Sequence, residues 1–438
     1  MTNQLLRLVD LRSQRLDLGL VEREVPRAAL DVNVALGQVR PIIESIRADG
    51  EAAIVELAQR FDQIDPRPLR VSAEELAAAL EALEPRLRDA IETSIARVRA
   101  VSEANLPDDT TVQLADGALV HQRWQPVDSV GLYVPGGKAV YPSSVIMNVV
   151  PAQAAGVSRL AVATPGQKAF GGRPHPTVLA TAALLGVTEV YAIGGPAAVA
   201  AFAYGIPDVL DRVELVTGPG NIFVTAAKRA LRGVIGIDSE AGTTEILVLA
   251  DATSDARLIA YDLISQAEHD EAAASVLVTD SAELIEAVQR EVAELALKTA
   301  HSERVLQALA GQQSAAVLVS DWSSAIEFTN LYATEHLEIH SADPKASLDR
   351  ISNAGAIFLG KYSPVSLGDY MAGSSHVLPT GYQAKFASGL GVHSFLRAQQ
   401  VIDYSAAGLE PIADLVNDFA KAEGLPAHGE AIKARFEN

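Results

Sequence analysis

The segment Val130-Gly131-Leu132-Tyr133-Val134 is a short, mostly apolar and β-branched run, and it begins the part of the chain that decides the fold. From here onward, runs of this kind alternate with helical runs, and a second series of the same kind begins near residue 245. Strands that alternate with helices are typical of parallel sheets that helices cover on both faces. The pattern therefore predicts an α/β fold.

Each series contains several strand candidates. The first series has them at 130–134, 160–163, 189–193 and 213–216, with helices predicted at 177–185 and 222–231. The second has them at 246–249, 276–278, 317–319 and 357–359, with helices predicted at 257–268, 282–295 and 323–332. Because one sheet with its helices forms one folding unit, two series predict two α/β domains with parallel sheets.

The first 105 residues are predicted to be mostly helical. Apolar residues between 34 and 61 recur at helical spacing, and Gly50 is expected to divide this stretch into two helices. Ser72 followed by Glu75 is the pattern of a capping box at a helix start. A further helix is expected at about 85–105, and a short, mostly helical tail from about residue 395.

Composition limits the classes of protein to which the chain can belong. The 438 residues exceed what one compact core supports, and they carry a formal net charge of -20. This charge argues against non-specific binding to nucleic acid or to an anionic membrane. There is no cysteine, which excludes disulfides, thiolate metal sites and cysteine nucleophiles. Any metal must therefore be held by His, Asp, Glu, Gln or Asn.

The sequence carries no sign of a membrane or secretory segment. Residues 1–10 lack the apolar run of a signal peptide. No stretch approaches the ~20 apolar residues that a membrane-spanning helix requires. We therefore expect a cytoplasmic protein with no membrane partner and no nucleic-acid partner.

Two glycine-containing turns follow predicted strands, namely Tyr133-Val134-Pro135-Gly136-Gly137-Lys138 and Gly218-Pro219-Gly220-Asn221. The first departs from the phosphate-loop pattern, because Gly137 stands where that pattern requires lysine. The second precedes a predicted helix, whose first amides could bind a pyrophosphate, but Phe223 breaks the dinucleotide-binding fingerprint. On these residues alone, both are better explained as tight turns than as nucleotide sites.

Two short clusters carry side chains suited to metal binding or proton transfer. Gln266 and His269 lie three residues apart on a predicted helix, so their side chains share one face and can reach one ion. Glu335 and His336 are adjacent, in a loop expected after a predicted helix. An imidazole titrates near neutrality, and burial can raise the pKa of a glutamate, so either group suits a general base.

Asp369 and His428 complete the set of candidates. Asp369 is expected in a loop after a predicted strand, and α/β proteins place their chemistry at the carboxyl ends of parallel strands. His428 stands alone in the tail. Each segment by itself is explained as ordinary polar surface. Together they offer two histidines, a carboxylate and an amide for one ion beside a Glu-His pair, as a zinc-dependent enzyme requires.

With these residues identified, the chain resembles the histidinol dehydrogenase family over nearly its whole length. The most specific stretches are Asp262-Leu263-Ile264-Ser265-Gln266-Ala267-Glu268-His269 and Ser363-Pro364-Val365-Ser366-Leu367-Gly368-Asp369-Tyr370. Similarity is strongest over residues 130–153, 218–251, 262–270, 333–340 and 354–380, and these five segments follow one another in the family's order.

The resemblance implies oxidation of L-histidinol to L-histidine through L-histidinaldehyde, the last step of L-histidine biosynthesis, in two NAD-dependent steps. It implies one zinc ion per subunit, held by residues that match Gln266, His269, Asp369 and His428. In the family the last of these comes from the partner in an intertwined homodimer with shared active sites. Glu335 and His336 match the catalytic pair. Substrate contacts match Thr244, Gln266, His269, His336, Asp369, Glu423 and His428, and NAD contacts match Tyr133 and Asn221.

The family's architecture implies two incomplete Rossmann-like domains with small helical terminal domains. We expect an N-terminal extension over residues 1–25 and a first α/β domain over 26–130 and 246–390, which holds the zinc and catalytic residues. A second, NAD-binding α/β domain is expected over 131–245, and a small C-terminal domain that supplies His428 over 391–438.

One departure from the family bears on the cofactor, because Ala197 stands where the family usually has a glutamine that contacts NAD. We therefore expect altered NAD affinity. Two other hypotheses remain. One is a paralogous zinc- and NAD-dependent dehydrogenase of another small polyol, such as a dihydroxypropanesulfonate; Glu423 argues against a sulfonated anion, since a carboxylate suits a cationic amine or imidazole. The other is a metal- or ligand-binding scaffold without catalysis.

Overall fold

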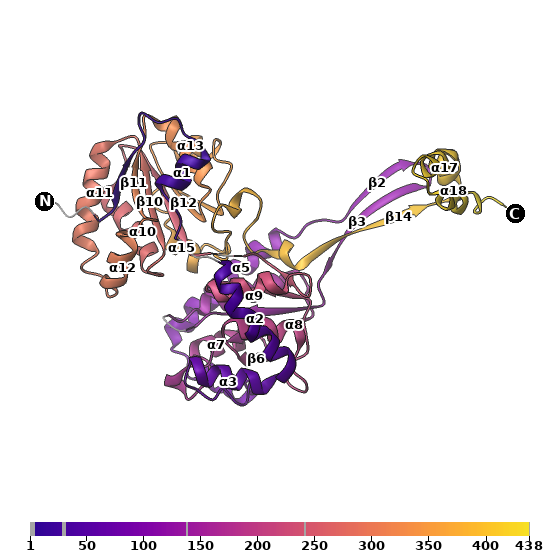
Figure 1. Cartoon of the computed structure of the whole chain (residues 1–438), viewed down its shortest axis with the longest axis horizontal. Coiled ribbons are helices and arrows are strands. Elements are labelled where there is room, and N and C mark those ends of the chain that lie inside the picture. The colour runs from indigo at the N-terminus through magenta and orange to yellow at the C-terminus, as the bar shows by residue number, and fades with distance from the viewer. Residues whose placement is uncertain (1–4, 29–31, 137–138, 241, 438) are drawn as a thin grey trace.

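Two parallel sheets and one long antiparallel arm organise the chain (Figure 1). The computed structural model describes residues 5–28, 32–136, 139–240 and 242–437. The larger sheet carries the N-terminal strand, the smaller sheet lies beside it, and the arm extends away from both and ends in the C-terminal helices. Within the described ranges, no helix is long and apolar enough to cross a membrane.

The larger sheet has six parallel strands in the order β1-β11-β10-β9-β12-β13. Its strands are β1 (Arg7–Asp10), β11 (Ala315–Leu318), β10 (Ala274–Thr279), β9 (Glu245–Ala250), β12 (His336–His340) and β13 (Ala356–Leu359). Ile246 and Val248 of β9 pack on one side, while Leu247 and Leu249 pack on the other. Because both faces are covered, the strand is apolar at successive positions.

Helices on both sides bury this sheet. One face is covered by α10 (Ala256–Ala267), α11 (Ala282–Leu295) and α12 (Ser302–Leu309), and the other by α1 (Leu18–Glu24) and α13 (Trp322–Tyr332). The short helices α14 (Pro344–Leu348) and α15 (Val365–Tyr370) flank β13 in the chain.

The smaller sheet has five parallel strands in the order β6-β5-β4-β7-β8. Its strands are β6 (Glu189–Ala192), β5 (Arg159–Thr164), β4 (Ser129–Tyr133), β7 (Leu215–Thr217) and β8 (Gly236–Ile237). One face packs on α4 (Ala73–Glu81), α5 (Pro85–Ala104), α6 (Pro142–Ala154) and α7 (Pro176–Leu184). The other packs on α2 (Val32–Asp49), α3 (Glu51–Phe61), α8 (Gly195–Tyr204) and α9 (Ile222–Leu231).

The arm is a three-stranded antiparallel sheet in the order β14-β3-β2. Its strands are β2 (Thr110–Ala115), β3 (Ala118–Pro126) and β14 (Leu396–Tyr404), followed by α16 (Ala406–Leu409), α17 (Ala413–Ala422) and α18 (Pro426–Lys433). Figure 1 shows α17 and α18 at the far end of the arm. Short 3-10 helices occupy Lys168–Phe170, Gln383–Lys385, Val392–Phe395 and Glu410–Ile412.

Most predicted elements of the two α/β series are confirmed within a few residues, and so is the fold class. Gly50 separates α2 from α3 with a left-handed φ of 55°, which glycine adopts without strain. Ser72 and Glu75 form the predicted capping box. The elements missed include β1, β12 and the whole antiparallel arm. The tail expected to be mostly helical also contributes the nine-residue strand β14.

The N-terminal third packs differently from the predicted domain division. Residues 7–10, expected in an N-terminal extension, form the edge strand of the larger sheet. The helices between residues 32 and 104, expected to belong with residues 246–390, pack on the smaller sheet instead. An apolar stripe reveals which side of a helix is buried but not which sheet buries it. The predicted domain boundaries themselves remain untested.

Replacing Phe202 with alanine should destabilise the smaller domain. Phe202 of α8 is fully buried, and its ring lies so close to Gly131 of β4 that a Cβ atom there would come within 2.5 Å of it. Phe202→Ala should cost about 3–5 kcal/mol, through lost apolar burial and the cavity left behind. Urea unfolding followed by circular dichroism measures the loss.

Phe386→Ala is the matched control, because Phe386 is 80% exposed. Its effect should stay within about 0.5 kcal/mol. Equal destabilisation by the two substitutions would contradict the packing of α8 on β4.

Candidate active site

The candidate site lies at the amino ends of two neighbouring strands of the larger sheet. Thr244 directly precedes β9, Glu335 directly precedes β12, and the two strands pair in parallel. Gln266 and His269 lie at the C-terminal end of α10, which returns to this same edge. The expectation that the chemistry sits at the carboxyl ends of these strands is therefore wrong for this sheet. Helix C-termini carry partial negative charge, which favours a cation at this edge.

Glu335 is buried and strongly hydrogen-bonded. Its Oε2 accepts hydrogen bonds from the Thr244 hydroxyl at 2.6 Å and from the Glu245 amide at 2.9 Å. Burial, the largest influence, raises the pKa of Glu335 to about 7, although His336 and these hydrogen bonds oppose the rise. A carboxyl group of this pKa can accept or release a proton near neutrality.

The His336 ring is held in one orientation by its Nδ1 atom. This nitrogen lies 3.1 Å from the Glu245 carbonyl oxygen, which can only accept a hydrogen bond, so Nδ1 carries the proton. In the neutral ring Nε2 is then an unprotonated acceptor. Nε2 is buried and has no hydrogen-bond partner among the described residues. The ring therefore presents a free base, and it begins β12 rather than lying in the loop expected for it.

Gln266 is oriented by the same network. Its Nε2 donates to the Thr244 hydroxyl at 2.7 Å, and that hydroxyl in turn donates to Glu335. This leaves the side-chain oxygen, Oε1, buried and without a hydrogen-bond partner among the described residues. An unpartnered buried oxygen costs free energy. Amide oxygen can ligate a divalent cation, so a metal ion here would satisfy it.

His269 lies within electrostatic reach of both Asp369 and His336. Burial lowers the pKa of His269, while the Asp369 carboxylate opposes that shift and His336 adds to it. A neutral imidazole beside a carboxylate is the form in which both bind zinc. Asp369 belongs to the short helix α15, not to the loop expected for it. The residues present therefore fit a metal site with Gln266, His269 and Asp369 as donors.

His376, which the site prediction omitted, lies beside Asp369. Its Nδ1 is 3.1 Å from the Asp369 carbonyl oxygen, and its Nε2 is 3.2 Å from the Ser144 hydroxyl of α6. Burial lowers the pKa of His376. This histidine therefore links the helix that carries Asp369 to the smaller domain.

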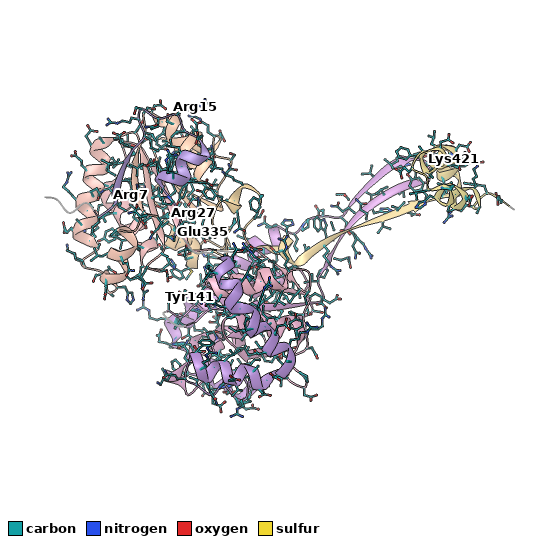
Figure 2. The ribbon with its side chains drawn as sticks, viewed as in Figure 1. Arg7, Arg15, Arg27, Tyr141, Glu335 and Lys421 are labelled. Carbon is teal, nitrogen blue, oxygen red and sulfur yellow. The ribbon has the colours of Figure 1, made fainter. Side chains whose placement is uncertain are left out.

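His428 and Glu423 lie far from these residues within one chain. Glu423 ends α17 and His428 lies in α18, both exposed at the tip of the arm. Figure 2 shows Lys421 of α17 at that tip and Glu335 in the body of the molecule. Within one chain, His428 therefore lies apart from the other three predicted metal ligands.

The predicted NAD contacts lie at the carboxyl edge of the smaller sheet. Tyr133 ends β4, and its buried hydroxyl accepts a hydrogen bond from the Gly195 amide at 3.0 Å. Burial raises the pKa of Tyr133 to about 12. Asn221 caps α9 after the neighbouring strand β7. Ala197 lies in the first turn of α8, and Gly137 and Lys138 of the first glycine-containing turn lie outside the described residues.

Sequence reasoning missed a second buried cluster, formed by Asp262, Glu338 and His340. One potential ligand atom from each lies within 4.8 Å of the others. Burial and the neighbouring Glu338 raise the pKa of Asp262. Glu338 also accepts a hydrogen bond at 2.8 Å from the Val365 amide at the start of α15. The cluster thus joins α10, β12 and α15, the three elements on which the site is built.

Comparison with known proteins points to one family. The histidinol dehydrogenase family model matches residues 25–436. The chain belongs to the histidinol dehydrogenase family. It is 54% identical to a histidinol dehydrogenase of Leifsonia xyli over 98% of this chain and 99% of that protein. Identity to the Corynebacterium glutamicum histidinol dehydrogenase is 53%, over 99% and 98% of the two chains.

A solved structure supports the same family assignment. The crystal structure of histidinol dehydrogenase from Elizabethkingia anophelis matches with a TM-score of 0.92 at 29% identity, covering 100% of this chain and 99% of that one. The predicted resemblance is therefore confirmed, and with it the prediction of an oxidoreductase of the histidinol dehydrogenase family. The hypothesis of a paralogue with another substrate is not favoured by these relatives.

Replacing Glu335 with glutamine should change how stability depends on pH in metal-free protein. Folding raises the pKa of this carboxyl group from 4.5 to about 7, so the folded state binds its proton more tightly. Its contribution to stability is full below about pH 4.5 and is lost as the pH rises through about 7. Glutamine stays neutral throughout. The unfolding free energy of Glu335→Gln minus that of wild type should therefore rise across this window, by on the order of 3 kcal/mol.

Urea titrations at several pH values after chelator treatment measure this difference. Glu81→Gln is the control, because Glu81 is exposed on α4. A difference for Glu335→Gln that stays flat with pH, as expected for the control, would contradict the raised pKa.

Proposed function

We propose that this chain oxidises L-histidinol to L-histidine through L-histidinaldehyde, in two NAD-dependent steps that complete L-histidine biosynthesis. The observation that carries the proposal is the pair of unpartnered buried atoms at the edge of the larger sheet. His336 Nε2 is a free base, and Gln266 Oε1 is an oxygen free to ligate a metal ion. Hydrogen bonds through Thr244 connect Gln266 to Glu335, which directly precedes His336. A base beside a metal-ligating group is the minimum that oxidation of a metal-bound amino alcohol requires.

His336 and Glu335 divide the proton transfers between them. His336 Nε2 takes the proton of the substrate hydroxyl as the carbon-bound hydrogen leaves as hydride. Glu335 then takes a proton from the water that adds to the aldehyde, and a second hydride leaves the resulting hydrate anion to give the carboxylic acid. Each step releases one proton, and two NAD⁺ accept the two hydrides. The pKa of Glu335, about 7, suits this task at neutral pH.

Gln266, His269, Asp369 and His428 of the partner subunit would hold one zinc ion per subunit. The ion, when bound, supplies a fixed anchor for the imidazole and amine nitrogens of L-histidinol. Thr244 lies within hydrogen-bond reach of both Gln266 and Glu335, so it would contact the substrate between metal and base. Glu423 would contribute a carboxylate toward the cationic substrate. Orientation of this kind lowers the barrier by proximity.

Tyr133 and Asn221 would contact NAD from the smaller domain. Both lie at the carboxyl edge of adjacent parallel strands, where α/β folds bind nucleotides. Asn221 already caps α9 through its side-chain oxygen, so its amide nitrogen is the group left for the cofactor. The Ala197 side chain cannot form a hydrogen bond at the start of α8, which supports the expectation of altered NAD affinity.

The arm supports the proposal of a homodimer with shared active sites. Leu415 is 67% exposed and Phe419 is 71% exposed at its tip. They line an apolar groove of about 480 Å³ that Glu423 and His428 also line. An arm with exposed apolar side chains beside two site residues suits docking on a second copy of the chain. The protein would act in the cytoplasm, which stays a prediction.

The catalytic assignment predicts the behaviour of one substitution. Wild-type, zinc-loaded protein should form two NADH per L-histidinol, followed at the NADH absorbance. His336→Gln should lower kcat by about 10²–10⁴-fold while zinc content stays at one per chain, because it removes the base and no metal ligand. His301→Gln, at an exposed position before α12, should match wild type. No NADH from metal-replete wild type would overturn the proposed function.

The shared site predicts complementation between two inactive variants. His336→Ala and His428→Ala should each be inactive alone. A co-expressed mixture forms dimers in which one site keeps His336 from one chain and His428 from the other. Random pairing should restore roughly a quarter of wild-type activity. Activity that stays absent, although native mass spectrometry finds the mixed dimer, would mean that both residues act within one chain.

A further inference from the structure

Arg27 is a buried cation outside every predicted site. It follows α1 in the chain, and its side chain is 13% exposed. Its Nε donates to Glu245 Oε2 at 2.6 Å, and its Nη2 donates to Glu245 Oε1 at 3.1 Å. A two-point contact of this kind fixes direction as well as distance. Arg27 therefore sets the position of the Glu245 carboxylate.

Two tyrosine rings lie against the guanidinium group of Arg27. Its central carbon lies 4.0 Å from the centre of the Tyr332 ring and 3.6 Å from that of Tyr382. Its Nη2 also donates to the Tyr332 carbonyl oxygen. Cation–π contacts with these two rings, which lie at 62° to each other, and these hydrogen bonds leave the group little freedom to move. Figure 2 labels Arg27 close to Glu335 in the same part of the molecule.

Glu245 joins this cation to the catalytic pair. As the first residue of β9, it donates its amide to Glu335 Oε2 at 2.9 Å and offers its carbonyl oxygen to His336 Nδ1 at 3.1 Å. Its carboxylate also accepts a hydrogen bond from the Gly381 amide at 3.2 Å. One peptide segment therefore orients both catalytic side chains, and the Arg27 pair anchors that segment.

A second connection reaches Glu335 from the other direction. Arg27 bonds the carbonyl oxygen of Tyr332 and lies 3.4 Å from that of Ala333. Ala333 has a φ of 48°, a left-handed conformation that costs an alanine free energy. The chain makes this turn two residues before Glu335. The guanidinium contacts hold the strained turn in place.

We propose that Arg27 is a positioning residue for the Glu335–His336 pair, acting through Glu245 and through the turn at Tyr332 and Ala333. The inference rests on the proposed roles of that pair. Arg27 touches neither reacting group. It fixes the Nδ1 hydrogen bond that leaves His336 Nε2 unprotonated, and it fixes the amide that holds Glu335.

Arg27→Ala should lower kcat on the order of 10²-fold, because small misplacements of catalytic groups have effects of this size. KM for NAD and the zinc content should stay as in wild type. Millimolar guanidinium chloride should restore several-fold of the lost kcat by refilling the space between the two tyrosine rings. Arg27→Lys keeps a charge but loses the two-point contact, so it should lower kcat at least tenfold.

Arg159→Ala is the matched control. Arg159 makes the same two-point contact with Glu189, at 3.0 and 2.8 Å, in the smaller domain. Its kcat should stay near that of wild type, and guanidinium should not raise it. Kinetics of Arg27→Ala and Arg27→Lys within twofold of wild type would overturn the inference. The inference would also be overturned if Arg27→Ala lost kcat that guanidinium failed to restore, while Arg27→Lys kept the kcat of wild type.

Nitrogen-15 NMR of the imidazole rings separates this inference from the proposed function, because it needs no turnover. Wild-type His336 should give the signature of a neutral ring protonated at Nδ1. Arg27→Ala should give a mixture of tautomers, and guanidinium should reverse the change. A His336 tautomer that Arg27→Ala leaves unchanged would overturn the positioning role. A wild type that shows the expected NMR signature but no activity would count against the proposed reaction alone.

Discussion

The parallel pairing of β9 with β12, in which His336 lies opposite Ile246, determines the geometry of the candidate site. This register brings the amide and carbonyl of Glu245 to the two side chains that open β12. A slip of one residue would turn every side chain of β12 to the other face of the sheet. The backbone ladder at the centre of the larger sheet thus positions Glu335 and His336. Gln266, His269 and Asp369, the predicted metal ligands, lie in or directly after neighbouring helices.

Burial determines how strongly the groups of the candidate site interact. Glu335 and His336 are both less than a tenth exposed, so water solvates their side chains poorly and their hydrogen bonds are strong. At an exposed position, water would hydrogen-bond to Gln266 Oε1 and to His336 Nε2. Two unsatisfied atoms in one place are costly in a folded protein, and a functional site is the usual reason that such a cost persists.

The sequence predicted the buried strands better than it predicted the surroundings of the candidate site residues. Val276 to Val278 forms a continuous apolar run, which indicates a strand wherever it occurs. The segment His336-Leu337-Glu338-Ile339-His340 alternates polar and apolar residues, a pattern of half-exposed strands, yet all five are buried. Its polar side chains pair with groups distant in the chain, which no local pattern reveals. The Arg27–Glu245 contact spans 218 residues and left no local signal for the same reason.

The larger sheet is assembled from both ends of the chain. Arg7 of β1 lies beside Ala315 of β11, and all five strands of the smaller sheet lie between these two residues in the chain. During synthesis on the ribosome, residues 7–10 therefore emerge long before residues 315–318. Until then, β1 cannot form its backbone hydrogen bonds with β11. The smaller sheet, whose strands all lie between residues 129 and 237, can close first. The order of translation thus favours formation of the smaller sheet before the larger sheet is completed.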